Sequence, residues 1–164
     1  MHLLVDAVAW LVVDMNPSLS DFQAQTNHFL DALALIPDRL RNQAPEGEWS
    51  AAYIVHHVSD GELHFAARYL HTLGSDNPTL VYFDEDRYPE ALSYDKRTVA
   101  KSLASIVGIR SMILEVLSQL DESAWSRTTT GEDGQVFTLA GLLEKASGHI
   151  ASHTDQLTAL HAQL

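Results

Sequence analysis

Residues 138–157 read TLAGLLEKASGHIASHTDQL, and this stretch decides the fold class. Apolar residues recur in it three or four positions apart, which places them on one face of an α-helix. The members of this stripe are Leu139, Leu142, Leu143, Ala146, Ile150 and Leu157. Thr138 is a good N-cap, because its hydroxyl can accept a hydrogen bond from the first turn. The spacing predicts an amphipathic helix from Thr138 to about Gln163 that packs against other helices.

Three other segments repeat this periodicity. A run of apolar residues over Ser20–Leu40 predicts the first helix, which Pro37 ends or kinks because proline has no backbone N–H. The second helix is expected over Trp49–Leu73, with Ser50 as its N-cap. The third is expected over Asp95–Leu120, where apolar residues form a steady stripe. Four long helices without convincing strand alternation indicate an all-α fold, a four-helix bundle.

The remaining segments connect or precede these helices. Residues 75–93 are loop-like, and the acidic run Asp84-Glu85-Asp86 within them is expected to form a lid or a pocket wall. Residues 121–137 are rich in threonine and glycine and predict a short hairpin around Gly131–Gly134. The apolar stretch His2–Val13 suggests an extra N-terminal helix, packed on the bundle or on a second subunit, or a wrongly chosen start codon. Residues 1–164 are expected to form a single domain.

Composition excludes several classes of function. The chain has no cysteine, so it has no disulfide and no thiolate nucleophile, and any metal must bind nitrogen and oxygen atoms. The lack of disulfides fits a reducing cytoplasm, the expected location. A formal net charge of −12 argues against nucleic-acid binding, because it would repel a phosphate backbone. The N-terminal apolar stretch lacks a basic n-region and is too short to cross a bilayer, so no signal peptide or membrane span is expected.

The last predicted helix carries two histidines on one face. His149 and His153 are four residues apart, the geometry that two ligands of one metal ion need. If His57 of the second helix faces this pair across the bundle, the three imidazoles form a site with open coordination positions. Such pairs are common by chance, so half-buried, hydrogen-bonded histidines are the alternative. His56 and His57 lie about 100° apart on a helix, so we expect His57 inside and His56 near Tyr53 on the outer side.

Two polar residues of the second helix lie near His57. Asp60, one turn away, is expected to orient an imidazole, to be a fourth ligand, or to be a surface carboxylate. His64 lies about 10 Å along the axis from His57, too far for the same ion but suited to the mouth of a pocket. We interpret Asp60 and His64 as candidate catalytic residues that orient ligands or move protons, a role also open to Tyr82.

The order and spacing of these residues resemble the DinB-like (DinB/YfiT) superfamily of metal-dependent enzymes over roughly residues 18–160. The matching positions are Trp49-Ser50, Ile54-Val55, His57 and Asp60 in the second helix, and His149, His153, Gln156 and Leu157 in the last. Asp84–Tyr88, Arg110, Trp125 and Gly134–Thr138 also match. The chain departs from the family at Tyr53, where Glu or Gln is more common, and in its N-terminal stretch, whose architecture the resemblance leaves open.

The resemblance implies a bundle in which His57, His149 and His153 surround a divalent metal ion. Three neutral imidazoles suit Zn²⁺, Ni²⁺, Fe²⁺ or Mn²⁺. Superfamily members are associated with hydrolysis and with transfer of small bacterial thiols, and many are dimeric. A small-molecule substrate and a homodimer are therefore expected. A low-molecular-weight thiol would have to be a cosubstrate, because this chain has no cysteine.

The rival interpretation is a non-catalytic bundle that serves as a binding or stress-response module. Its metal would then stabilise the structure or be absent. A structural metal site is closed, so a fourth protein ligand such as Asp60 or His64 would complete the shell.

Overall fold

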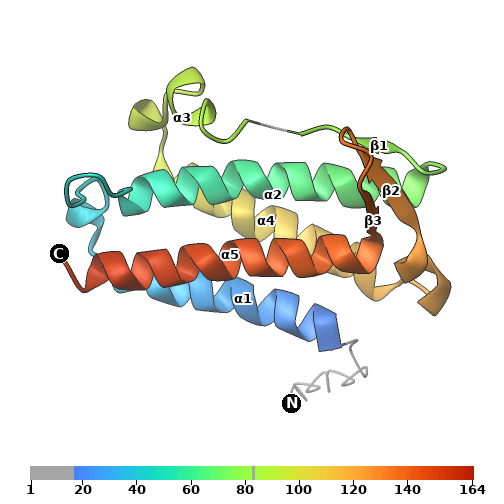
Figure 1. The fold of residues 1–164 in the computed structure, drawn as a ribbon. Coiled ribbons are helices and arrows are strands. Elements are labelled where there is room, and N and C mark those ends of the chain that lie inside the picture. Colours follow the sequence, from blue (N-terminus) through green and yellow to red (C-terminus); the bar gives the residue numbers. More distant parts are fainter. Residues whose placement is uncertain (1–16, 83) are drawn as a thin grey trace, which may run out of the picture.

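The computed structural model describes residues 17–82 and 84–164. Its main elements are four long helices, α1 (Pro17–Ala34), α2 (Ala51–Gly74), α4 (Val99–Ser118) and α5 (Leu139–His161) (Figure 1). Helix α1 packs against α4 and α5, and α2 packs against the same two helices, so α1 and α2 occupy opposite corners of a bundle. The predicted four-helix bundle is confirmed. The expected N-terminal helix over His2–Val13 falls outside the described residues.

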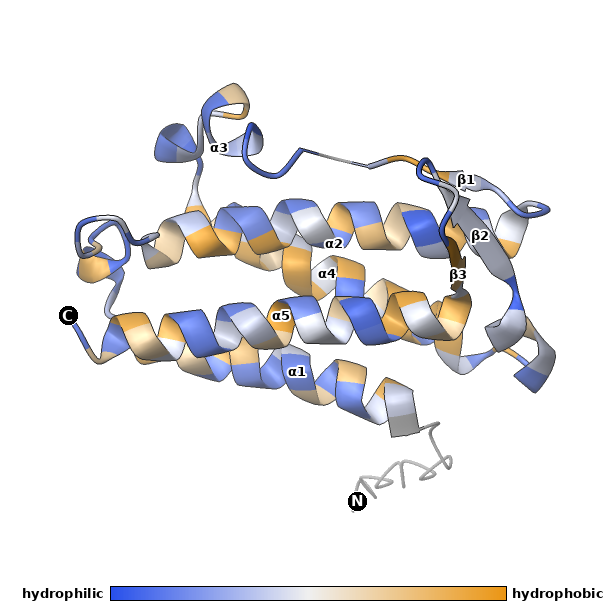
Figure 2. Cartoon of the chain, in the orientation of Figure 1, coloured by the Kyte–Doolittle hydropathy of each residue, from blue (hydrophilic) through white to orange (hydrophobic). Residues whose placement is uncertain are grey.

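Two apolar clusters fill the interior, one at each end of the bundle. Figure 2 shows apolar and polar residues alternating along each helix, as one buried face requires. The largest members of the first cluster include Phe22, Phe65, Tyr69, Ile113, Leu117 and Leu142, and those of the second include Phe29, Leu33, Ile36, Ile54, Ile106 and Leu157. Between the two clusters each helix contributes one polar residue to a central layer, namely Thr26, Glu62, Arg110 and His149. One member of this layer, His149, also belongs to the candidate site described below.

The predicted N-caps of two helices are present. The Ser50 hydroxyl accepts a hydrogen bond from the Tyr53 N–H (3.3 Å), and the Thr138 hydroxyl accepts one from the Gly141 N–H (3.0 Å). Not every large apolar side chain of α2 is buried, because Leu63 and Leu70 are exposed. The interior positions around them are taken by polar groups, among them Glu62.

The predicted ends of the other two helices were wrong. Helix α1 begins at Pro17, since proline is well tolerated at the first helical position, and it ends at Ala34 rather than Leu40. Pro37 disfavours helical backbone at the preceding residue, and Asp38–Leu40 form a separate 3₁₀ turn, η1. Helix α4 begins at Val99, after a second 3₁₀ turn, η2 (Tyr94–Lys96), and two extended residues.

The connections contain short regular elements, of which only the hairpin is predicted from the sequence. Strand β1 (Thr79–Leu80) runs parallel to β2 (Thr128–Gly131), which pairs antiparallel with β3 (Val136–Thr138). The expected hairpin is thereby confirmed, and it forms the centre and edge of a three-stranded sheet at one end of the bundle. A one-turn helix, α3 (Tyr88–Ala91), precedes η2, and a 3₁₀ helix, η3 (Glu122–Ser126), precedes β2. Among the described helices, none has the length and apolar character needed to cross a membrane.

Candidate metal centre

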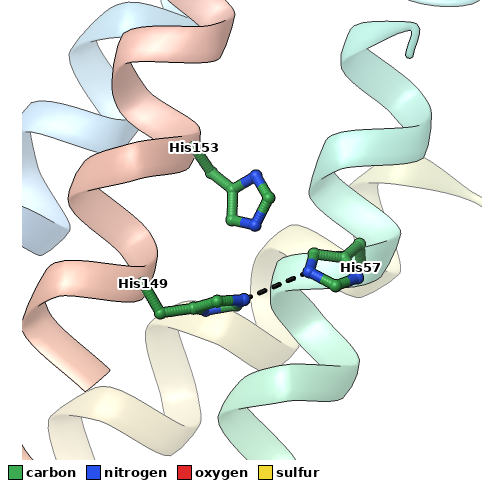
Figure 3. Close-up of side chains that lie close together, drawn as sticks. All are labelled: His57, His149 and His153. Carbon is green, nitrogen blue, oxygen red and sulfur yellow. Dashed lines mark hydrogen bonds between the residues drawn. The ribbon is translucent and has the colours of Figure 1, made fainter. Parts of the chain in front are cut away.

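The structure brings together the three histidines that the sequence singled out. His57 projects from α2, and His149 and His153 project from α5 into the space between the two helices (Figure 3). One ring nitrogen of each lies within 4.8 Å of the others. The Nε2 atoms of His57 and His149 are 3.1 Å apart, so one of these rings donates a hydrogen bond to the other. The cluster is buried at His57 and partly buried at the other two rings.

These three residues fit a divalent cation. Nitrogens bound to one Zn²⁺ at 2.0–2.1 Å can be no more than about 4.2 Å apart, so the observed cluster needs only a small rotation of a ring to reach that spacing. The amide oxygen of Gln156 lies 3.0 Å from His153 Nδ1. Because this oxygen can only accept, Nδ1 carries the proton and Nε2 keeps a free lone pair directed at the other histidines. His149 Nδ1 is buried without a partner among the described residues, a cost that packing alone does not explain.

The electrostatic setting keeps the three rings neutral. Burial, followed by repulsion from His153, lowers the pKa of His57 to about 4. Burial and repulsion from His153 and His57 lower the pKa of His149 to about 3. Burial also lowers the pKa of His153, against the opposing effects of Gln156 and Glu85. At neutral pH all three rings are therefore uncharged, and each has one nitrogen lone pair to offer a metal.

Aromatic side chains and a glycine hold the rings in place. The Trp49 ring lies nearly parallel to that of His153, with centroids 6.3 Å apart, and meets the edge of His57 at 5.1 Å. Phe65 lies 5.8 Å from the ring of His149. Gly61 lies directly under this ring, and a Cβ at that position would lie 2.9 Å from its Cε1 atom. A larger residue at position 61 would therefore displace His149.

Glu85 is the acidic residue closest to the cluster. Its Oε2 atom lies 3.7 Å from His57 Nε2, and 59% of its side chain is exposed. The acidic run was expected to form a lid or a pocket wall, without a separate role for Glu85. The sequence signal for a role of Glu85 was the acidic run that contains it. Its distance from the histidines could not be predicted, because that distance depends on the path of the connection between α2 and α4.

The two candidate catalytic residues are bound to side chains other than the three histidines, and Asp60 is buried rather than a surface carboxylate. Asp60 accepts hydrogen bonds from the Tyr94 hydroxyl (2.8 Å) and from Arg97 (2.6 Å), which also forms an ion pair with it. The partner of His64 is the hydroxyl of Tyr88 in α3, 2.9 Å from Nε2. Tyr82 donates to Asp133 at 3.0 Å, in the hairpin between β2 and β3.

The expectation for His56 was wrong. This side chain is only 1% exposed, and its Nδ1 atom lies 2.9 Å from the Ser102 hydroxyl of α4. Helix α2 contacts α5 on one side and α4 on the other. Two histidines that are about 100° apart can therefore both be buried, each against a different neighbour.

Comparisons with known proteins agree with this architecture. The family model of the DinB superfamily matches residues 19–157. A protein from Oceanobacillus iheyensis, provisionally named a metal-dependent hydrolase, is 23% identical over 144 residues, which cover 87% of this chain and 82% of the relative. A Bacillus cereus protein with the same provisional name is 26% identical over 118 residues, covering 72% and 68%.

Two solved structures share the fold. YfiT from Bacillus subtilis, described provisionally as a metal-dependent hydrolase with an unusual four-helix bundle topology, has a TM-score of 0.81 at 19% identity, covering 90% of this chain and 85% of its own. The mycothiol-dependent maleylpyruvate isomerase has a TM-score of 0.71 at 15% identity, covering 86% and 59%. These TM-scores show a common fold, and the family match spans most of the chain. The protein belongs to the DinB superfamily.

Proposed function

We propose that this protein is a metal-dependent enzyme that acts on a small molecule, with His57, His149 and His153 as the protein ligands of a divalent cation. The observation that carries the proposal is the convergence of three neutral imidazoles within 4.8 Å across α2 and α5. A donor set made only of nitrogen suits Zn²⁺, Ni²⁺, Fe²⁺ or Mn²⁺. When bound, such a cation supplies Lewis acidity, which lowers the pKa of a water molecule or a thiol.

Hydrolysis is the first candidate reaction. The relatives from Oceanobacillus iheyensis and Bacillus cereus carry provisional names of metal-dependent hydrolases, which supports this class. Glu85 supplies what the histidines lack, a carboxylate that can accept a proton from an attacking nucleophile. Its distance of 3.7 Å from His57 Nε2 and its exposure place it at the solvent side of the cluster, where substrate would enter.

Transfer of a small thiol is the second candidate. The fold is shared with a mycothiol-dependent isomerase, whose name states its use of a low-molecular-weight thiol. This chain has no cysteine, so any thiol nucleophile must be supplied as a cosubstrate. The same imidazoles and the same carboxylate would serve this reaction, with the thiol in place of water.

Asp60 and His64 act as positioning residues in this proposal. The Asp60 carboxylate ties α2 to the segment that carries Tyr94 and Arg97. His64 contacts Tyr88, which follows the acidic run by two residues, so this contact fixes the loop that presents Glu85. Because each residue has these partners, neither is well placed to close a structural metal site, which favours the open site over the non-catalytic alternative.

Metal analysis tests the proposal directly. Protein purified without a polyhistidine tag should contain about one ion per chain, and His153→Ala should contain almost none, because two imidazoles bind far more weakly than three. His161→Ala is the matched control, since His161 is an exposed histidine in the last turn of the same helix. Full metal content in His153→Ala would remove the basis of the proposal.

Activity separates the enzyme from a metal-stabilised bundle. Esterase and amidase substrates, and electrophiles offered with a small thiol, should be turned over only by metal-loaded protein. Glu85→Gln should retain metal while its turnover falls by about 10²- to 10⁴-fold, the usual contribution of a general base. Strong stabilisation by metal without turnover of any substrate would favour the structural role. Light scattering would test the predicted homodimer in the same samples.

A further inference from the structure

We propose that the groove between α2 and the N-terminal end of α4 is a second binding site, which takes a small molecule bearing an oxyanion such as a phosphate ester or a carboxylate. The groove has a volume of about 350 Å³, within the range of small-molecule sites. Its lining includes three cationic side chains, Lys96, Arg97 and Lys101, and the hydroxyls of Ser59, Thr98 and Ser105. Its lining residues include no carboxylate.

The cationic lining is unusual for this protein. The chain has only ten lysines and arginines against 22 acidic residues, yet three of the ten gather here. Arg97 is already paired with Asp60. Within residues 17–82 and 84–164, no carboxylate lies within ion-pair distance of the ammonium groups of Lys96 and Lys101. These two charges therefore remain available to a ligand of opposite sign.

The start of α4 adds the positive end of a helix dipole to the same groove. Thr98 is the N-cap of this 20-residue helix, and its hydroxyl does not cap the first turn. The first N–H groups of a helix have no acceptor within the helix and carry the positive end of its dipole. They attract anions, and Lys101 lies within this first turn.

Ser59 adds a side-chain donor from α2 to the groove. Its side chain is 1% exposed, it borders the groove, and its hydroxyl makes no hydrogen bond to any residue in the described part of the chain. By contrast, the neighbouring Ser102 hydroxyl is held by His56 at 2.9 Å and by Arg97 at 3.2 Å. The Ser59 hydroxyl therefore opens onto the groove, where it can donate a hydrogen bond to a ligand oxygen.

The groove is separate from the metal centre. Ser59 follows His57 by two residues, so their side chains point about 200° apart around α2. His57 faces α5, whereas Ser59 faces α4. The second site therefore does not depend on the proposed enzymatic function, and its ligand does not touch the histidine cluster.

An NMR titration of the full ¹⁵N-labelled chain tests this site, with inorganic phosphate in one series and succinate in another, at constant ionic strength. Saturable shifts at the amides of Ser59 and residues 98–102 are expected in at least one series. Each lysine removed by Lys96→Gln or Lys101→Gln should weaken binding about tenfold, because it removes one charge-assisted hydrogen bond. Ser105→Leu should block binding by filling the groove without changing its charge.

Lys145→Gln is the matched control, because this lysine lies on α5 over the Phe137 ring, away from the groove. It should bind as the natural chain does. Stronger binding of phosphate assigns the site to phosphate esters, and stronger binding of succinate assigns it to carboxylates. Shifts that do not saturate, or equal binding by the lysine variants and Lys145→Gln, would overturn the proposal. Metal content stays unchanged in all these variants if the two sites are separate.

Discussion

Two clusters of polar side chains lie between the helices of the bundle, yet they are built in opposite ways. Arg110 donates to Glu62 Oε1 (2.7 Å), to the Thr26 hydroxyl (2.6 Å) and to the Phe22 carbonyl oxygen (2.7 Å). Its guanidinium also stacks over the Phe22 ring, 3.6 Å from the centroid. Here charges and donors are matched within the protein, which is what a buried ion pair requires to persist.

The histidine cluster leaves its polar atoms unmatched. His149 Nδ1 has no partner among the described residues, and the contact between His57 and His149 joins two nitrogens that compete for one proton. A satisfied polar cluster stabilises the fold, whereas an unsatisfied one whose lone pairs converge indicates a ligand. The two clusters should therefore respond differently to substitution: one through stability, the other through binding.

The largest effect is expected at the ion pair. Arg110→Met should lower the free energy of unfolding by about 3–5 kcal/mol, because it leaves the buried Glu62 carboxylate without its cation. Urea denaturation of metal-free protein measures this loss. Arg39→Met, at an exposed arginine in η1, should change stability by less than about 0.5 kcal/mol. A similar small change in Arg110→Met would erase the difference between the two clusters.

The pH dependence of stability should come largely from the histidines. In the metal-free protein the pKa of His57 is about 4 and that of His149 about 3, below the ordinary 6.5. Because the unfolded chain binds more protons between these values, the free energy of unfolding should decrease as the pH falls from about 6.5 towards 4. The slope is at most about 1.4 kcal/mol per pH unit for each such histidine.

Urea titrations in the presence of a chelator, from about pH 7 to about pH 5, measure this slope. His57→Gln removes one titrating ring, so its slope should be shallower than that of the natural chain. An equal slope in both proteins would assign the pH dependence to other groups.

A smaller effect is expected at the residue that fixes the tautomer of His153. Gln156→Leu should weaken metal binding about 10- to 100-fold, since partners of metal-bound histidines typically contribute that much. Metal-free stability should change little, because the residue is only partly buried. Competition with a chromogenic chelator measures the affinity, and Gln163→Leu at the exposed end of the chain is the control. Unchanged affinity would mean that His153 is held by Trp49 alone.

The fold could be predicted from sequence where local chemistry decides it. Ser50 and Thr138 predicted two helix starts correctly, because a hydroxyl side chain just before an amphipathic segment favours the N-cap position. The end of α1 and the start of α4 were misplaced, because apolar periodicity continues past the point where the backbone leaves the helix. Apolar character alone does not predict burial either: Leu63 is exposed, whereas the neighbouring Glu62 is buried in an ion pair with Arg110.

The site could be predicted only as far as spacing allows. His149 and His153 share a face through their separation of four, and His57 was selected as their partner. The approach of Glu85 depends on a long connection whose path no local pattern encodes. The error at His56 arose because we assumed that α2 has one buried face, so that only one of two adjacent histidines could be buried. A helix at the corner of a bundle has two buried sides, and both His56 and His57 are buried.

The role of Gly61 could not be predicted from the sequence. A substitution at this position gives the most selective test of whether the histidine cluster serves binding and the ion pair serves stability. Gly61→Ala places a Cβ 2.9 Å from His149 Cε1, so the imidazole must shift. Metal affinity should fall about tenfold, as for other changes that misorient a ligand. Metal-free stability should change by less than about 1 kcal/mol, because the helix propensity of alanine offsets the displacement of the ring.

Gly108→Ala in α4 is the matched control, because no atom lies within 4 Å of its added Cβ. It should gain up to about 1 kcal/mol of stability and bind metal unchanged. The pair of variants thus separates a glycine that makes room for a ligand from one that only loosens a helix. If Gly61→Ala lost stability and kept its metal affinity, the histidine cluster would behave like the ion pair, as a part of the structure.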